Sequence, residues 1–423
     1  MRQDARMLAA LFGRSMGLDD AWEVSGTWFE EVEGGPDELH AGVARRRGHA
    51  IPCPECGVPC GVHDARERTW RHLDIWQSGT YVHCAVPRTD CPEHGVRTVP
   101  VPWEVRPNSH FTALFEAQVL AACMRGSTAE AVAEALGEDD RRPRDMLGRA
   151  VAQARGSADY SGVRRVGTGE TSRSRGHTYI STMPGLDGRR CARRGRRKRL
   201  GSVGRMCGQL EARGGDGAAI AEVTRDMSGS LSSGVPGEMP QATQTIDRFH
   251  VMQLFSRATD RVRCRERRES DEKREAPERT KYVWPEREEG PAERQREVRE
   301  RLAPNRSHLK TARTCQTAEA MRDVYGCETA AEAEPMLDRL PGWTAHPDVP
   351  ETGKVARTVR ENREGIPGYL DGRPANAYLE GANSLIQSIK RAARGFRNVG
   401  YFTTAIFLRL GGLSFDALAC AQS

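Results

Sequence analysis

The chain has 423 residues, of which 38% are hydrophobic and 29% are charged, and its 64 basic and 58 acidic side chains give a net charge of +6. This length predicts two to four compact units, and the composition is typical of a soluble protein with a large wetted surface. No apolar run approaches the roughly 18 residues that a membrane-spanning helix needs, and the first residues lack the pattern of a secretory signal. We therefore expect a cytoplasmic protein without a membrane partner.

The basic residues are concentrated in two segments. Eight of the eleven residues from Arg189 to Arg199 are Lys or Arg, and the second segment holds Lys390, Arg391, Arg394 and Arg397. Such clusters favour contact with phosphates, although a solvated surface is the alternative for each. A strand could not easily bury the first segment on either face.

The twelve cysteines do not predict a disulfide framework, because a cytoplasmic chain of this length keeps its thiols reduced and can build an ordinary core. Five of them lie between Cys53 and Cys91. The other seven are scattered singly, which is typical of small buried side chains.

Two ligand pairs with the same spacing occur in the cysteine-rich region. The first is Cys53 with Cys56, and the second is Cys91 with His94. Two such pairs on separate turns can supply the four tetrahedral ligands of zinc, and a site filled by four protein ligands is structural rather than catalytic. Free thiols with an exposed histidine are the alternative, and other candidate ligands nearby are Cys60, His63 and Cys84.

The N-terminal third predicts small β-rich and helical parts. We expect a short amphipathic helix at residues 6–16, a strand pair around residues 22–32, a polar stretch at residues 34–48, and strands at residues 79–86 and 96–101. Apolar spacing predicts a helix at residues 111–124. A second helix runs from the cap at Thr128 to Leu136, Gly137 ends it, and a third begins near Pro143. This succession resembles a DNA-reading helix-turn-helix.

The rest of the chain first alternates between strands and helices and then becomes entirely helical in prediction. Strands are expected at residues 162–168, 177–183 and 219–224, with a helix near residues 203–213, which indicates a mixed α/β sheet. Charged helices, including residues 256–274 and 291–302, follow as an insertion. Helices at residues 376–394 and 401–410 close the chain.

These patterns predict six segments. They are an N-terminal segment (1–50), a zinc-binding module (51–105), a helix-turn-helix domain (106–160), the first part of an α/β core (161–255), a helical insertion (256–365) and the second part of the core (366–423).

Taken in order, several short motifs resemble the ISL3 type of insertion-sequence transposase. They are Cys53–Gly57, Thr69–Leu73, Cys91–Gly95 followed by Pro102-Trp103, Gly169–Ser172, Gly176–Tyr179, Arg225–Ser228, Asp247–Val251, Asn376–Asn383, Ile389–Arg391 and Gly395–Asn398. Together they span most of the chain, and their number and order make the resemblance specific.

The resemblance implies a ribonuclease H-like core with three catalytic carboxylates that cuts and joins DNA. Two magnesium ions serve such chemistry, and magnesium prefers oxygen ligands. Asp226 and Glu380 match the second and third carboxylates of the family, whereas each alone could be a turn cap or a surface residue.

The first carboxylate is missing, because the matching position is Gly169. Glu170 is adjacent, but it should face away from Asp226, since successive strand side chains point to opposite faces. Two further carboxylates are nearby. Asp187 aligns with a non-catalytic position of the family, and Asp247 is expected to fix Arg248 or a helix start.

The sequence therefore predicts a transposase that binds double-stranded DNA at the inverted repeats of its element and cleaves it weakly or not at all. The basic residues from Lys390 to Arg397 would contact phosphates beside the cleaved bond. A DNA-binding remnant or repressor without catalysis is the alternative. By family resemblance, we expect a homodimer or larger assembly on DNA.

Overall fold

The computed structural model describes residues 9–10, 12–14, 16–49, 51–174, 178–186, 190–195, 202–227, 229–269, 310–344, 349–371, 373–393, 396 and 398–415. The chain forms two compact units. Unit 1 contains Met1–Ser157 with Arg397–Arg409 and Leu413–Ser423, and unit 2 contains Ala158–Phe396 with Leu410–Gly412. Among the described residues, none of the helices combines the length and apolar character that crossing a bilayer requires.

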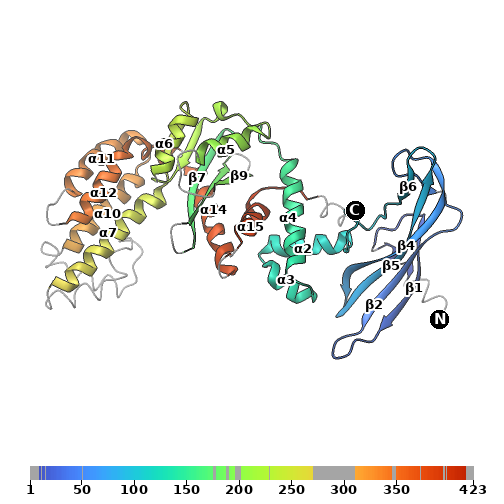
Figure 1. Ribbon diagram of the computed structural model, residues 1–423. Helices are drawn as coiled ribbons and strands as arrows, with labels where there is room; N and C mark the ends of the chain where they lie inside the picture. Colours follow the sequence, from blue (N-terminus) through green and yellow to red (C-terminus); the bar gives the residue numbers. More distant parts are fainter. Residues whose placement is uncertain are drawn as a thin grey trace. The chain divides into compact units, whose positions relative to one another are not determined.

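A twisted sheet forms the first part of unit 1 and is drawn in blue in Figure 1. The strands pair in the order β1-β2-β5-β4-β3, and β6 pairs with β5. Their bounds are Trp22–Glu30 for β1, Glu38–Arg45 for β2, Ile51–Pro52 for β3, Pro59–Ile75 for β4, Ser78–Cys91 for β5 and Gly95–Thr98 for β6.

The expectation for residues 22–48 was wrong in one respect. Residues 22–30 form a single strand, and its antiparallel partner β2 lies inside the stretch that the sequence indicated as polar. Leu39, Ala41 and Val43 alternate along β2 and are buried, so the strand has one apolar face despite its charged surroundings.

Three tryptophans pack at the centre of the core under this sheet. Trp103 meets Trp22 and Trp70 edge to face, with ring centroids 5.1 and 5.4 Å apart. Trp70 is fully buried, and its indole N–H donates to the carboxylate of Glu104 at 2.6 Å. The buried indole therefore has a hydrogen-bond partner, as a buried polar atom requires.

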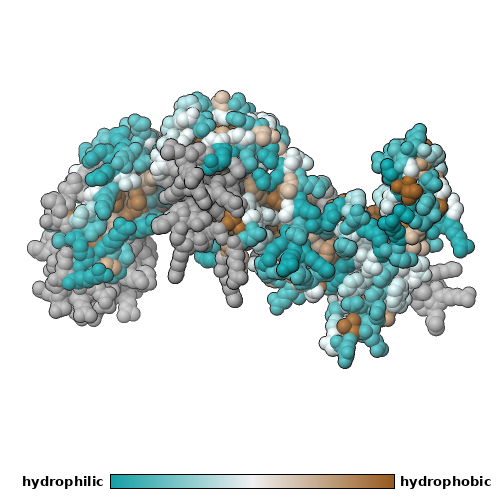
Figure 2. Space-filling view, in the orientation of Figure 1, coloured by the Kyte–Doolittle hydropathy of each residue, from teal (hydrophilic) through white to brown (hydrophobic). Residues whose placement is uncertain are grey.

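The helix-turn-helix prediction is confirmed. Helices α2 (Ala113–Arg125), α3 (Ala129–Leu136) and α4 (Arg141–Gly156) follow one another. The Thr112 and Thr128 side chains cap α2 and α3, and Gly137 ends α3 in the left-handed conformation with φ of 65°. The surface over α2 and α3 is mainly hydrophilic in Figure 2.

The last helix of the described residues, α15 (Val399–Leu410), also belongs to unit 1, apart from its final residue. This differs from the expected grouping of residues 366–423 with the core. Its buried side chains include Phe402, Ile406 and Phe407.

Unit 2 is built on a mixed five-stranded sheet with the order β11-β10-β7-β8-β9. The strands are Arg165–Ser174 (β7), Thr178–Gly185 (β8), Arg190–Gly195 (β9), Glu222–Arg225 (β10) and Thr243–Ile246 (β11). β7, β10 and β11 run parallel, while β8 and β9 pair antiparallel. A mixed α/β sheet was expected. Helices α5 (Ser202–Glu211) and α6 (Gly229–Glu238) share an apolar core with the strands.

The basic segment contains a strand, contrary to expectation. Backbone pairing with β8 makes Arg190–Gly195 the edge strand β9. An edge strand pairs on one side only, and charged side chains there are common because they prevent association with other strands. Residues 187–189 and 196–201 lie outside the described residues.

Long helices follow β11, as expected for an insertion. They are α7 (Arg248–Glu269), α10 (Lys310–Gly326), α11 (Ala330–Thr344) and α12 (Pro350–Glu361), and they share one apolar core with Ile246. The helix expected at residues 291–302 lies outside the described residues. A 3-10 turn (Arg363–Gly365) and α13 (Gly368–Asp371) lead to α14 (Arg373–Ala392), which lies against β7.

Candidate metal centres and nucleic-acid interface

The two predicted ligand pairs lie on two tight turns built in the same way. In the first, the Gly57 N–H donates to the Cys53 carbonyl at 2.8 Å, and Gly57 has φ of 72°. In the second, Gly95 follows His94 with φ of 65° and opens β6. Glycine adopts this left-handed conformation without steric cost, which lets each turn present two ligands on one side.

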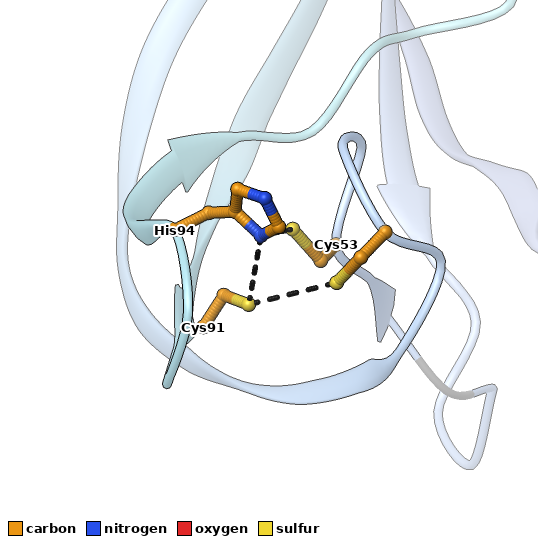
Figure 3. Close-up of side chains that lie close together, drawn as sticks. Cys53, Cys91 and His94 are labelled. Atoms are coloured by element: carbon orange, nitrogen blue, oxygen red, sulfur yellow. Dashed lines mark hydrogen bonds between the residues drawn. The ribbon is translucent and has the colours of Figure 1, made fainter.

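The four ligand atoms converge. Cys53, Cys56, Cys91 and His94 offer atoms that all lie within 4.8 Å of one another. The Cys91 Sγ lies 3.7 Å from the Cys56 Sγ and 3.6 Å from the His94 Nδ1. These separations match the edges of a tetrahedron with zinc-to-ligand bonds of about 2.0–2.3 Å. Figure 3 shows the Cys53, Cys91 and His94 side chains pointing toward one another.

The surroundings favour the thiolate form of one ligand. Backbone hydrogen bonding at His94 and Glu93 lowers the pKa of the Cys91 thiol to about 7, although desolvation opposes it. Thiolates are the form in which cysteines bind metals.

The alternative ligands do not join this group. The Cys60 thiol donates to the Val58 carbonyl at 3.2 Å and interacts with the Cys91 thiol, but it is not one of the four converging ligands. His63 lies 3.6 Å from the Asp64 carboxylate. Cys84 is buried in the core beneath the sheet, and burial raises the pKa of its thiol to about 12. The four residues selected by spacing are thus the ones that the fold brings together.

A second candidate site lies in unit 2 where β10 and β11 end beside the middle of the parallel strand β7. Thr168 of β7 pairs with Arg225 of β10, and Arg225 pairs with Ile246 of β11. The next residues along the chain are Gly169, which lies within β7, and Asp226 and Asp247, which directly follow β10 and β11. Pairing at matched positions carries these three residues to the same level of the sheet. Two of them supply carboxylates, and the third supplies no side chain.

The end of β10 is held by a buried arginine. The Arg225 guanidinium donates to Gln244 Oε1 at 2.7 Å, to Ser232 Oγ at 2.8 Å and to Asn362 Oδ1 at 3.2 Å. It also donates to the backbone carbonyl of Asp226 at 3.2 Å. Burial lowers the pKa of Arg225, while the charge of Asp226 opposes the shift. Three side-chain partners therefore hold the Arg225 guanidinium, which in turn bonds to the backbone of Asp226.

Asp247 caps the helix that follows it, in agreement with one of the two expectations for this residue. Its Oδ1 accepts from the Phe249 N–H at 2.9 Å, and its Oδ2 pairs with His250 Nδ1 at 2.7 Å. Burial alone would lower the pKa of His250, but Asp247 and the more distant charge of Asp226 raise it. Sequence reasoning missed His250, although its position three residues after Asp247 on a helix is a usable signal.

The remaining core candidates are placed only in part. Glu380 lies in α14, the helix against β7, and its side chain is outside the described part. The same holds for the Glu170 side chain in β7, and Asp187 falls outside the described residues altogether.

The helix-turn-helix is fastened to the sheet of unit 1 by the motif at residues 69–73. The buried Arg71 guanidinium donates to the carbonyl of Leu136, the last residue of α3, at 3.3 Å, and its Nε lies 3.7 Å from Glu138 in the turn. His72 Nδ1 lies 2.9 Å from the hydroxyl of Thr112, which caps α2. Burial lowers the pKa of His72 to about 4.

Helix α4 carries three exposed arginines that were not predicted as interface residues, namely Arg141, Arg142 and Arg149. Two of them have acidic partners, since Arg142 pairs with Glu138 and Arg149 lies 3.7 Å from the Glu116 carboxylate. Their concentration on a predicted helix could have revealed them. Among the residues predicted to contact DNA, Lys390 is half-buried and Arg391 exposed at the end of α14, while Arg394 and Arg397 lie outside the described residues.

Comparison with known proteins identifies three matching regions. A family model described as a transposase, of the ISL3 type, matches residues 166–406. Models of the zinc finger of the transposases of IS204, IS1001, IS1096 and IS1165 and of the helix-turn-helix domain of transposase family ISL3 match residues 49–94 and 99–142.

Two curated relatives resemble the chain along most of its length. The transposase for insertion sequence element IS1557 of Mycobacterium tuberculosis is 25% identical over 435 residues, covering 95% of each chain. The transposase for insertion sequence element IS1001 of Bordetella parapertussis is 25% identical over 374 residues, covering 83% of this chain and 86% of the relative.

Proposed function

Because the chain belongs to the ISL3 family of insertion-sequence transposases, we propose that it binds the terminal inverted repeats of its own element through unit 1. Unit 2 is then a ribonuclease H-like nuclease core, impaired by the glycine at position 169. The observation that carries the proposal is the pairing of β7 with β10, because Gly169 within β7 and Asp226 directly after β10 each follow the matched pair Thr168–Arg225.

The topology of unit 2 supports the nuclease assignment. Strands β7, β8 and β9 form an antiparallel series, and β10 and β11 extend the sheet in parallel on the other side of β7. Carboxylates at adjacent strand ends, with a third on a helix against the first strand, are a suitable arrangement for a divalent cation site.

Asp226 and Glu380 are the residues that would hold magnesium. Asp226 is fixed by its position at the end of β10, where Arg225 anchors its backbone. Magnesium, when bound, would activate the attacking oxygen and stabilise the departing one. With Gly169 in place of a carboxylate, the donor set fits the ion only in part, so we expect weak binding and slow cleavage.

Zinc fits the Cys53, Cys56, Cys91 and His94 group, because four protein ligands at tetrahedral separations complete its coordination. The ion would be structural. It would hold the two turns together at one end of β5, within the unit that carries the helix-turn-helix.

The DNA contact is proposed for α4 and for the basic residues from Lys390 onward. Arg141, Arg142 and Arg149 offer charges for phosphates or base edges. The DNA backbone near the cleaved bond would be contacted by Lys390, Arg391, Arg394 and Arg397. Since transposition joins two ends, we propose that two or more copies act together on DNA.

A second candidate function is favoured by Gly169 alone. A chain that binds element ends without cutting them would act as a repressor of related elements or persist as a decayed copy. The two candidates predict the same binding and differ in strand cleavage.

One experiment tests binding and cleavage separately. The end duplex, with its sequence taken from the DNA that flanks the gene, and a scrambled duplex are titrated with the full-length protein, and a pre-nicked end duplex is then incubated with manganese or magnesium. We expect at least about a thousandfold preference for the end duplex and slow cleavage that Asp226→Asn abolishes. Equal affinity for both duplexes would refute end recognition, and metal-dependent cleavage that survives Asp226→Asn would refute the proposed nuclease site.

A further inference from the structure

The C-terminal helix α15 packs on the helix-turn-helix of unit 1, although more than 240 residues separate them in the chain. From its contacts we infer that α15 is the fourth helix of the DNA-binding domain and that Tyr401 is a positioning residue for the recognition helix α4. The inference rests on the proposed end recognition and adds a residue on which its specificity depends.

Tyr401 acts first on α3. Its hydroxyl accepts a hydrogen bond from the backbone N–H of Ala129, the first residue of α3, at 2.9 Å. The first N–H groups of a helix have no acceptor inside the helix. The Thr128 side chain accepts from Ala131. Tyr401 and Thr128 thus satisfy two different donors at the same helix end, one from a distant part of the chain and one locally.

The ring of Tyr401 acts on α4. The Arg144 guanidinium, in the first turn of α4, lies 5.5 Å from the ring centroid. The same guanidinium pairs with Glu130 of α3 at 2.5 Å and with Asp140 of the turn at 2.6 Å. Tyr401 therefore contacts both helices at the place where the angle between them is set. That angle determines how a recognition helix enters a groove.

Two further contacts fasten the other end of α15. The Arg155 guanidinium, at the end of α4, lies 3.9 Å from the ring centroid of Phe407, which is buried. The guanidinium of Arg409 lies beside Gly126, which ends α2. α15 thus contacts all three preceding helices of the domain. Because α15 contacts both ends of α4, it acts as a brace for that helix.

The test uses four forms of the full-length protein. Tyr401→Phe removes the acceptor and keeps the ring, while Tyr401→Ala removes both. Thr404→Ala is the matched control, because its hydroxyl bonds back to the Gly400 carbonyl within α15. Affinities for the end duplex and for a scrambled duplex of equal composition are measured at fixed salt, because phosphate contacts make affinity depend on salt.

The expected change is a loss of discrimination. Tyr401→Phe should weaken end binding about fivefold, as one lost hydrogen bond implies. Tyr401→Ala should weaken it about twentyfold or more, because the ring contact with Arg144 is lost as well. Binding to the scrambled duplex should change little, and Thr404→Ala should behave as wild type. Wild-type discrimination by Tyr401→Ala would overturn the inference.

Hydrogen exchange of the DNA-free protein separates this inference from the proposed function. Amides of residues 129–136 should exchange about fivefold faster in Tyr401→Phe than in Thr404→Ala, since a lost cap frees the helix end. If wild type prefers neither duplex, end recognition fails while faster exchange still supports α15 as a brace. Equal exchange in the two variants would overturn the brace itself.

Discussion

At the scale of single residues, the buried polar side chains lie where segments distant in sequence meet. Arg71 and His72 join the sheet of unit 1 to its helices, and Arg225 joins β10 to the residue that follows α12. A buried polar group without a partner is costly, so each of these contacts favours one arrangement of the segments over others. Spacing along the sequence could not reveal the contacts, because their partners are distant or lie on other elements.

His72 gives a pH-dependent prediction. Its pKa is about 4 in the folded protein and 6.5 as a free side chain, so between these values the unfolded chain binds one more proton. The contribution of His72 to the free energy of unfolding is therefore fully present above pH 6.5. It falls by about 3 kcal/mol as the pH drops toward 4.

The measurement is the unfolding free energy of wild type and His72→Asn at pH 7 and pH 4.5 in urea. The wild-type value should fall more steeply on acidification, because Asn does not titrate. Parallel losses in both proteins would show that His72 is not the group responsible. Both proteins carry the same candidate metal ligands, so the pH dependence that those ligands contribute cancels when the two proteins are compared at each pH.

At the scale of elements, local patterns were predictable and long-range pairing was not. Thr128 and Gly137 mark the two ends of α3 both in the sequence prediction and in the structure, since caps act within one turn. The equal spacing of the two ligand pairs likewise identified Cys53, Cys56, Cys91 and His94. The strand β2 and the edge strand β9 were missed, because their partners lie on other segments and their own residues are rich in charge or glycine. The position of α15 depends on the hydrogen bond between Ala129 and Tyr401, and no local sequence pattern predicts that contact.

The two turns proposed to bind zinc give a prediction at this scale. Cys53→Ser or Cys91→Ser should remove the bound zinc, about one ion per chain, and lower the melting temperature of unit 1. Cys60→Ser is the control, since Cys60 is a neighbouring thiol that interacts with Cys91 but is not one of the four converging ligands. Zinc content by atomic emission and thermal unfolding by circular dichroism measure both effects. Loss of zinc from Cys60→Ser with retention in Cys53→Ser would reverse the ligand assignment.

At the scale of the whole molecule, the family membership accounts for the order of the parts: a zinc finger, a helix-turn-helix and a transposase domain. The sequence predicted this order because its motifs are short and local. The proposed nuclease site was less predictable, since it depends on the register of β7, β10 and β11. That register puts Asp247 in line with Asp226, where the sequence alone suggested only a helix start or a contact with Arg248.

Magnesium-dependent cleavage of a pre-nicked end duplex, compared between Gly169→Asp and wild type, shows whether position 169 belongs to the proposed cation site. If position 169 and Asp226 share one cation site, the added carboxylate should increase the cleavage rate by at least about tenfold. Asp226→Asn in the same protein should remove the gain. An unchanged rate in Gly169→Asp, with binding of the end duplex intact, would show that position 169 and Asp226 do not share a cation site.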